Sequence, residues 1–276
     1  MSALDFSKLG KTGAQSEDLT KNISFERELP EEGLAFLRLI GYIETGKHAP
    51  RNPSHSNSFK VKLTFELSHK RHLIEIEGNK VPQKFVLNMN KGKTAASGYK
   101  KVFNMMNKAL GGGHTSFFEM MGKPLLGEVF HNEGKEDDKG NKPKYANLDQ
   151  AGAYSFKSPV QEDPISGEMV TVPVPEVHNE MQGFMWENES FDDATYIAMW
   201  DSLYIDGTKE IDDPKNKGEK ITVSKNWLQE LIISNLDWEG STCQALTQQH
   251  VDLDDIGGDV SIDLSDSAES NTPISM

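Results

Sequence analysis

The sequence is poor in cysteine and in long apolar runs, and each shortage excludes a class of protein. Cys243 is the only cysteine among 276 residues, which rules out an intramolecular disulfide and a cysteine-cluster metal site. No apolar run approaches the length of a membrane span, and the opening MSALDFSKLG lacks the apolar centre of a signal peptide. We therefore expect a protein without a membrane segment, in a reducing compartment such as the cytoplasm.

Positive charge is also scarce, but only in the second half of the chain. Residues 151–276 hold 6 Lys and Arg against 25 Asp and Glu, whereas residues 31–110 hold 14 against 6. The net charge of −14 for the whole chain argues against an anionic partner, yet this split indicates a basic binding surface attached to an acidic extension. The alternative is two oppositely charged solvated faces without a binding role.

Alternating apolar residues predict a mainly β domain over residues 31–156. The expected strands cover residues 36–44, 58–68, 72–78, 84–90, 122–133 and 143–156. Residues 97–113 have helical spacing and end in a glycine run. Five or six strands with one helix in the middle is the element order of an OB-fold barrel.

The rest of the chain divides by composition. Residues 1–30 are predicted to be an N-terminal extension, residues 157–222 an acidic irregular segment and residues 223–240 an amphipathic helix capped by Ser224. Residues 241–276 are predicted to be a disordered acidic tail, because charge, glycine and serine resist burial.

The outward faces of the expected strands carry cations and aromatic residues, as a groove for single-stranded nucleic acid requires. In the first strand, Leu37, Leu39, Gly41 and Ile43 are assigned to the buried face, and Arg38 and Tyr42 to the opposite one. The predicted DNA-binding residues are Arg38, Tyr42, Lys60, Lys62 and Lys84 on strands, Lys47, Arg51, Lys91 and Lys93 on loops, and Tyr99 and Lys100 at the helix start.

Three segments invite a catalytic or metal-binding interpretation, and each fits its motif poorly. The GKT of residues 92–94 lacks the preceding glycine of a phosphate-binding loop, since position 87 is Leu. His69 and His72 fit solvated loop histidines better than metal ligands, and the EIEGNK of residues 75–80 only loosely matches a metal-dependent nuclease. We therefore expect no metal, no cofactor and no enzymatic activity.

Several ordered segments resemble the bacteriophage single-stranded DNA-binding proteins of the OB-fold type. These segments are FLRLIGYIETGKH, KVKLTFEL, FVLNM, MMGKPLLGEVFHNE and KYANLDQAG, and the similarity spans roughly residues 35 to 240. The matching positions are Gly41, Gly46, Thr64, Glu66, Gly122, Pro124, His131, Glu133, Tyr145, Ala146 and Asn147. The resemblance implies non-catalytic binding of single-stranded DNA during phage replication and recombination, in the cytoplasm of a bacterial host.

The acidic tail is expected to act as a tethered competitor of DNA. Its polyanion could occupy the cationic groove when DNA is absent, and meet replication or recombination proteins when a strand displaces it. Its carboxylates are Asp252, Asp254, Asp255, Asp259, Asp263, Asp266 and Glu269. Self-association stays open, as do two other functions: an acidic adaptor or DNA mimic, and a metal-dependent nuclease.

Overall fold

The computed structural model describes most of the chain between residues 29 and 247. The described ranges are 29–50, 52–76, 78–136, 142–187, 191–213, 216 and 218–247. The predicted N-terminal extension lies almost entirely outside them. Most of the predicted disordered tail lies outside them too, but residues 242–247, its first part, form a short helix.

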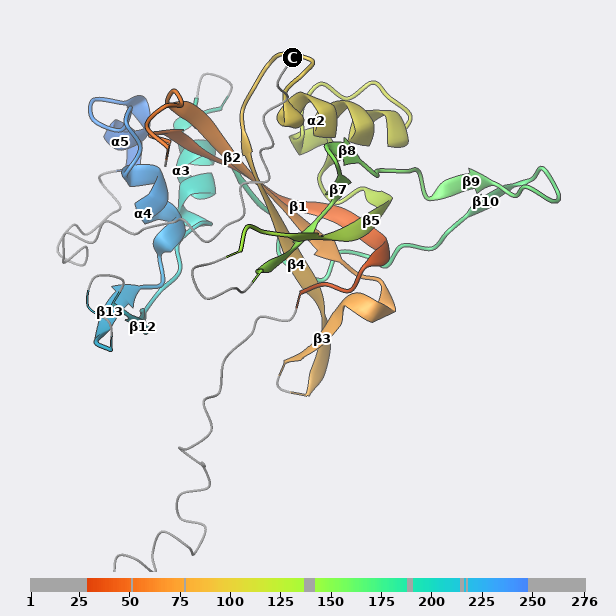
Figure 1. Ribbon diagram of the computed structural model, residues 1–276. Helices are drawn as coiled ribbons and strands as arrows, with labels where there is room; N and C mark the ends of the chain where they lie inside the picture. Colours follow the sequence, from red (N-terminus) through yellow and green to blue (C-terminus); the bar gives the residue numbers. More distant parts are fainter. Residues whose placement is uncertain are drawn as a thin grey trace, which may run out of the picture.

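The central element is a curled antiparallel sheet that forms a half-barrel (Figure 1). Its strand order is β3-β4-β2-β1-β5-β6. The bounds are β1 Gly33–His48, β2 Ser58–Leu67, β3 Leu73–Ile76, β4 Asn79–Asn90, β5 Pro124–Glu133 and β6 Lys144–Asn147, with the small pair β7 Asp149–Gln150 and β8 Ala153–Tyr154 after them. This topology confirms the predicted mainly β, OB-like fold.

Helix α2 (Gly98–Ala109) lies between β4 and β5 in the chain, as predicted, and packs against the barrel core. The Ser97 hydroxyl caps it by accepting the Lys100 backbone N–H at 3.2 Å. Val102 and Met106 are fully buried against the inner side chains of the sheet. Two short 3₁₀ turns, Lys70–His72 and Phe118–Met120, complete this half of the chain.

A β-bulge in β1 reverses the predicted faces of that strand beyond residue 39. Leu39 pairs with Phe65 and Gly41 with Thr64, so Ile40 is an extra residue without a partner on β2. Because faces alternate residue by residue, Tyr42 points into the barrel core with Leu37 and Leu39. Ile43, predicted for that core, belongs instead to a second cluster on the other side.

The segment predicted to be irregular, residues 157–222, contains regular structure. It holds a two-stranded arm (β9 Val160–Glu162 and β10 Met169–Thr171), strand β11 Gln182–Phe184, helix α3 Asp193–Asp201 and the hairpin of β12 Thr208–Asp212 with β13 Lys220–Ser224. The prediction missed these elements because their strands are only three to five residues long and mostly exposed.

The helix predicted over residues 223–240 is shorter than expected. Residues up to Ser224 belong to β13, and α4 covers only Trp227–Ile233, with Asn226 rather than Ser224 at its N-cap. Helix α5 (Thr242–Thr247) follows after a turn.

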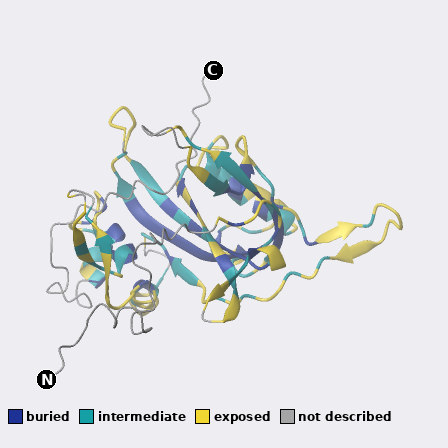
Figure 2. Ribbon diagram, turned by 60° about the horizontal axis from the view of Figure 1, so that its bottom comes forward, coloured by how far each residue is buried: buried dark blue, intermediate teal, exposed yellow. Residues whose placement is uncertain are grey.

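A second apolar cluster joins these C-terminal elements to the sheet. Strand β11 pairs in parallel with β1 at Gly41–Ile43, and Phe184 packs with Tyr196 and Trp200 of α3. Figure 2 shows the buried residues running along the sheet and into this cluster.

Gly46 makes the close approach of α4 to β1 feasible. Its φ of +87° is unfavourable for other residues, and a Cβ there would lie 2.5 Å from Cγ of Asn235. Directly beyond, the Leu236 N–H donates to the carbonyl of Lys47 at 2.8 Å. A glycine at this position therefore serves the docking of the C-terminal elements.

Candidate nucleic-acid interface

The outer side of β2 and β4 forms an open, polar surface that we call the β2–β4 face. It consists of Lys60, Lys62 and Thr64 on β2 and Lys84, Val86, Asn88 and Asn90 on β4. The strand register places Lys60 opposite Asn90 and Lys62 opposite Asn88, and the four β4 residues are exposed. The structure thus brings together three predicted binding residues: Lys60, Lys62 and Lys84.

Lys62 lies between Lys60 and Thr64 in the β2 part of this face. Its Nζ donates to Oδ1 of Asn88 at 2.7 Å and lies 5.3 Å from the centroid of the Trp227 ring. The ammonium of Lys62 is therefore held by a hydrogen bond to a polar neighbour and lies over an aromatic ring.

Trp227 is a candidate binding residue that the sequence did not single out. The helical pattern assigned it to the buried stripe with Leu228, Leu231 and Ile232, and those three are buried. Trp227 is only half-buried: its ring packs against the second apolar cluster, as the pattern predicts, and also lies beside Lys62. The helical spacing of Trp227 does not reveal whether its ring lies wholly in the core or also at the edge of the β2–β4 face.

Burial lowers the pKa of the Lys62 ammonium to about 8. The side chain is charged below this pKa and loses its charge above it. We predict that affinity for single-stranded DNA falls by about three- to tenfold between pH 7 and pH 9.5, measured by fluorescence anisotropy at constant salt. A Lys62→Arg variant, which stays charged, should show a flatter profile. Parallel profiles for both proteins would contradict the assignment.

Arg38, predicted to bind DNA, is buried in a structural contact. Its Nε donates to the carbonyl of Pro175 at 2.7 Å, and its Nη2 to that of Val174 at 3.1 Å. The Arg38 side chain is almost inaccessible to solvent, because residues 174–179 cross the sheet beside Arg38 of β1 and its partner Glu66 of β2. The DNA-binding prediction for Arg38 is therefore wrong.

Glu66 anchors the same crossing segment. It points away from the barrel core, as predicted, yet it is fully buried. Its carboxylate accepts the backbone N–H groups of His178 and Asn179 at 2.8–3.1 Å and the Asn179 Nδ2 at 2.7 Å. Residues 174–179 thus cover the outer side of β2 at Glu66, whereas Lys84, opposite Glu66 on β4, stays exposed.

Tyr42, the second correction, lies inside the molecule. It is 4% exposed, and its hydroxyl donates to Oε1 of Glu44 at 2.6 Å and lies 2.9 Å from the Tyr99 hydroxyl. Burial, with the neighbouring Glu44 charge, raises the pKa of Tyr42 far above its usual range. The bulge at Ile40 is the physical reason, since it turns this ring inward and away from the β2–β4 face.

Tyr42 forms the floor of a hollow that we call the aromatic cleft, with a volume of about 180 Å³. The Nζ of Lys91 lies 2.6 Å from Oε1 of the buried Glu44, and the Nζ of Lys100 lies 4.8 Å from the Phe103 ring centroid. The predicted residues Tyr99, Lys91 and Lys100 therefore gather here. The lining residues are Tyr42, Glu44, Lys91, Tyr99, Lys100, Phe103, Thr115, Ser116, Phe117, Phe118 and Met185.

The remaining predicted residues belong to neither of the two sets or lie outside the described residues. Lys47 faces Asp237 with an Nζ–Oδ1 distance of 3.8 Å, and Lys93 is exposed on the loop after β4. Arg51 lies outside the described residues. So do all the tail carboxylates: Asp252, Asp254, Asp255, Asp259, Asp263, Asp266 and Glu269.

The two histidines considered as metal ligands are engaged elsewhere. His72 is buried with Nε2 2.9 Å from the carbonyl of Glu31, and Nδ1 of His69 accepts the Arg71 N–H at 3.4 Å. Burial lowers the pKa of both imidazoles. Within the described ranges, no three His, Cys, Asp or Glu side chains are grouped so that they could hold a metal ion.

Searches for similar proteins leave the function to be argued from the structure. No family model, curated protein or solved structure matches the chain. Among the described residues, no helix has the length and apolar character needed to cross a membrane.

Proposed function

We propose that the chain is a non-catalytic single-stranded DNA-binding protein, and that DNA lies along the β2–β4 face. The observation that carries the proposal is the half-buried Lys62–Trp227 pair beside the exposed β4 residues of an OB-like sheet. A positive charge beside an aromatic ring is the combination that holds a phosphate and stacks a base. The second and third strands of OB-folds are the usual place for such binding.

The biological setting follows from the sequence resemblance. Phage OB-fold proteins of this kind act in DNA replication and recombination, and we propose the same setting here, in the cytoplasm of a bacterial host. Replication or recombination proteins are the proposed partners of the acidic tail. The cationic residues of the face would contact phosphates without reading sequence, so we expect little preference among base sequences.

Trp227 allows a direct test of the proposed surface. The other three tryptophans, Trp186, Trp200 and Trp238, form a ring cluster in the second core. We predict that oligonucleotides quench the tryptophan emission, and that Trp227→Phe removes most of this quenching while affinity stays within about threefold. Trp227→Ala should weaken binding about tenfold, because a stacked base is lost.

A matched control separates stacking from a general change in the protein. Trp186→Phe replaces one indole of the core cluster by a phenyl ring. This variant should retain the quenching by oligonucleotides. If quenching persisted in Trp227→Phe, or if duplex DNA bound as tightly as single strands, the proposed surface or the proposed function would be wrong.

A further inference from the structure

The arm formed by β9 and β10 projects from the body of the molecule in both views (Figures 1 and 2). Its tip is a defined turn, in which the Asp163 N–H donates to the carbonyl of Glu168 and the Gly167 N–H to that of Asp163, both at 2.8 Å. The Asp163 side chain also accepts the N–H of Ile165 at 2.8 Å. Hydrogen bonds thus hold Ile165 at the outer end of the arm.

The arm exposes apolar side chains along its length. Ile165 is 95% exposed and Met169 66%, and Val160 and Val170 on the strands are also exposed. Single exposed apolar residues are ordinary, but four on one short hairpin indicate an interaction surface, with Val160 and Met169 on one face of the arm and Val170 on the other. A two-stranded hairpin is also marginal in water without a packing partner.

The charge of the arm limits the chemistry of its partner. Residues 158–173 contain Glu162, Asp163 and Glu168 and neither Lys nor Arg. A carboxylate on each side of Ile165 requires a receptor that is apolar inside and positive at its rim.

The aromatic cleft of the same chain has this chemistry. Phe103, Phe117, Phe118 and Met185 line it. Its charged lining residues are two cations, Lys91 and Lys100, and one carboxylate, Glu44, so the net charge of the lining is +1. Tyr99 and Lys100 belong to the first turn of α2, whose N-terminal end adds positive potential. The cleft is thus suited to an isoleucine flanked by carboxylates.

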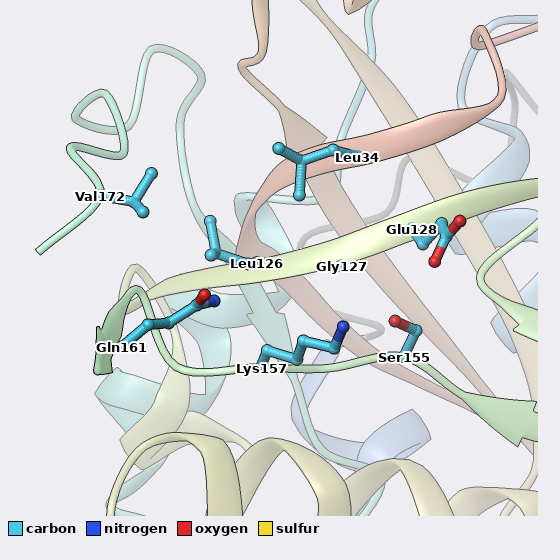
Figure 3. A pocket seen from close by; sticks show the side chains of 8 residues that line it. All are labelled: Leu34, Leu126, Gly127, Glu128, Ser155, Lys157, Gln161 and Val172. Atoms are coloured by element: carbon cyan, nitrogen blue, oxygen red, sulfur yellow. The ribbon is translucent and has the colours of Figure 1, made fainter. Parts of the chain in front are cut away.

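The other hollow, of about 230 Å³ at the base of the arm, fits less well (Figure 3). Gln161 and Val172, at the base of the arm, line this hollow. The tip of the same arm lies at the other end of the hairpin, away from the hollow. Its two charged groups, Lys157 and Glu128, are of opposite sign. It therefore lacks the positive rim that an acidic tip requires.

We propose that the arm of one molecule inserts Ile165 into the aromatic cleft of a second copy of the chain. The two contacting surfaces differ, so the contact is head-to-tail, and each molecule keeps a free arm at one end and a free cleft at the other. Such contacts generate open chains of molecules, which would place successive molecules along a DNA strand. The inference stands apart from DNA binding and is tested without DNA.

Sedimentation of the full chain measures this association directly. We expect the wild-type protein to self-associate with increasing concentration, and Ile165→Asp to weaken the association at least about tenfold. Ile76→Asp is the matched control, because Ile76 is 51% exposed on a different hairpin. A wild-type protein that stays monomeric, or an Ile165→Asp variant that associates like wild type, would overturn the proposal.

A mixing experiment distinguishes arm-to-cleft from arm-to-arm contact. Lys100→Glu damages the cleft and leaves the arm intact, and an acidic residue in the first turn of α2 is compatible with the helix. Ile165→Asp and Lys100→Glu should each be monomeric alone and form a 1:1 dimer when mixed. Two variants that remain monomeric on mixing would exclude the head-to-tail contact, and circular dichroism checks that both are folded.

Discussion

Replacing Lys60 and Lys62 together with glutamate is expected to weaken single-stranded DNA binding at least about a hundredfold at low salt. The two lysines lie on the same side of β2, facing Asn90 and Asn88 of β4. Their replacement removes two phosphate contacts and adds two repulsive charges. The slope of log affinity against log salt should therefore become shallower by about 1.4, measured by titration at several salt concentrations.

The control for this double variant carries the same change of charge at the other end of the strands. Lys70, in the 3₁₀ turn before β3, and Lys80, at the start of β4, are both exposed and lie beyond the segment that covers Glu66. The Lys70→Glu, Lys80→Glu variant should bind DNA within a few-fold of wild type. An equal loss in both variants would mean that net charge, not the β2–β4 face, governs binding. Urea unfolding of both proteins checks that the fold is retained.

Glu66→Ala is expected to lower the free energy of unfolding by about 3 kcal/mol. The carboxylate is fully buried, and its removal leaves the donors of His178 and Asn179 without their acceptor. Residues 174–179 should then loosen from the sheet, which would appear as faster hydrogen exchange of the His178 and Asn179 amides.

Glu75→Ala provides the comparison for the Glu66 variant. Glu75 is an exposed carboxylate on β3, and its removal should change the free energy of unfolding by less than about 0.5 kcal/mol. A similarly small change for Glu66→Ala would show that the crossing segment is held by other contacts.

The barrel and its helix could be predicted from the sequence because the patterns that define them are local. Alternation in KVKLTFEL identifies β2 and its inner residues without knowledge of any partner strand, and the spacing of Val102 and Met106 identifies α2. The same alternation placed Lys60, Lys62 and Lys84 on one outer face, which the pairing of β2 with β4 confirms.

The errors in the candidate site have long-range causes. Arg38 has the right phase for an outer face, but a segment more than 130 residues later in the chain covers it. Tyr42 was assigned to the wrong side because a bulge depends on pairing with β2, and no residue near Ile40 marks it in the sequence. Trp227 acquires its place beside Lys62 only when α4 docks against β1.

By itself, the sequence determined the mainly β barrel, the central helix, the basic character of one outer face and the acidic character of the C-terminal half. Those properties depend on residue type and on spacing within one strand or helix. Tertiary structure alone decided which cations stay open to solvent, which aromatic ring stands beside them and where the acidic arm projects. These outcomes depend on contacts between residues far apart in the chain, which local periodicity does not encode.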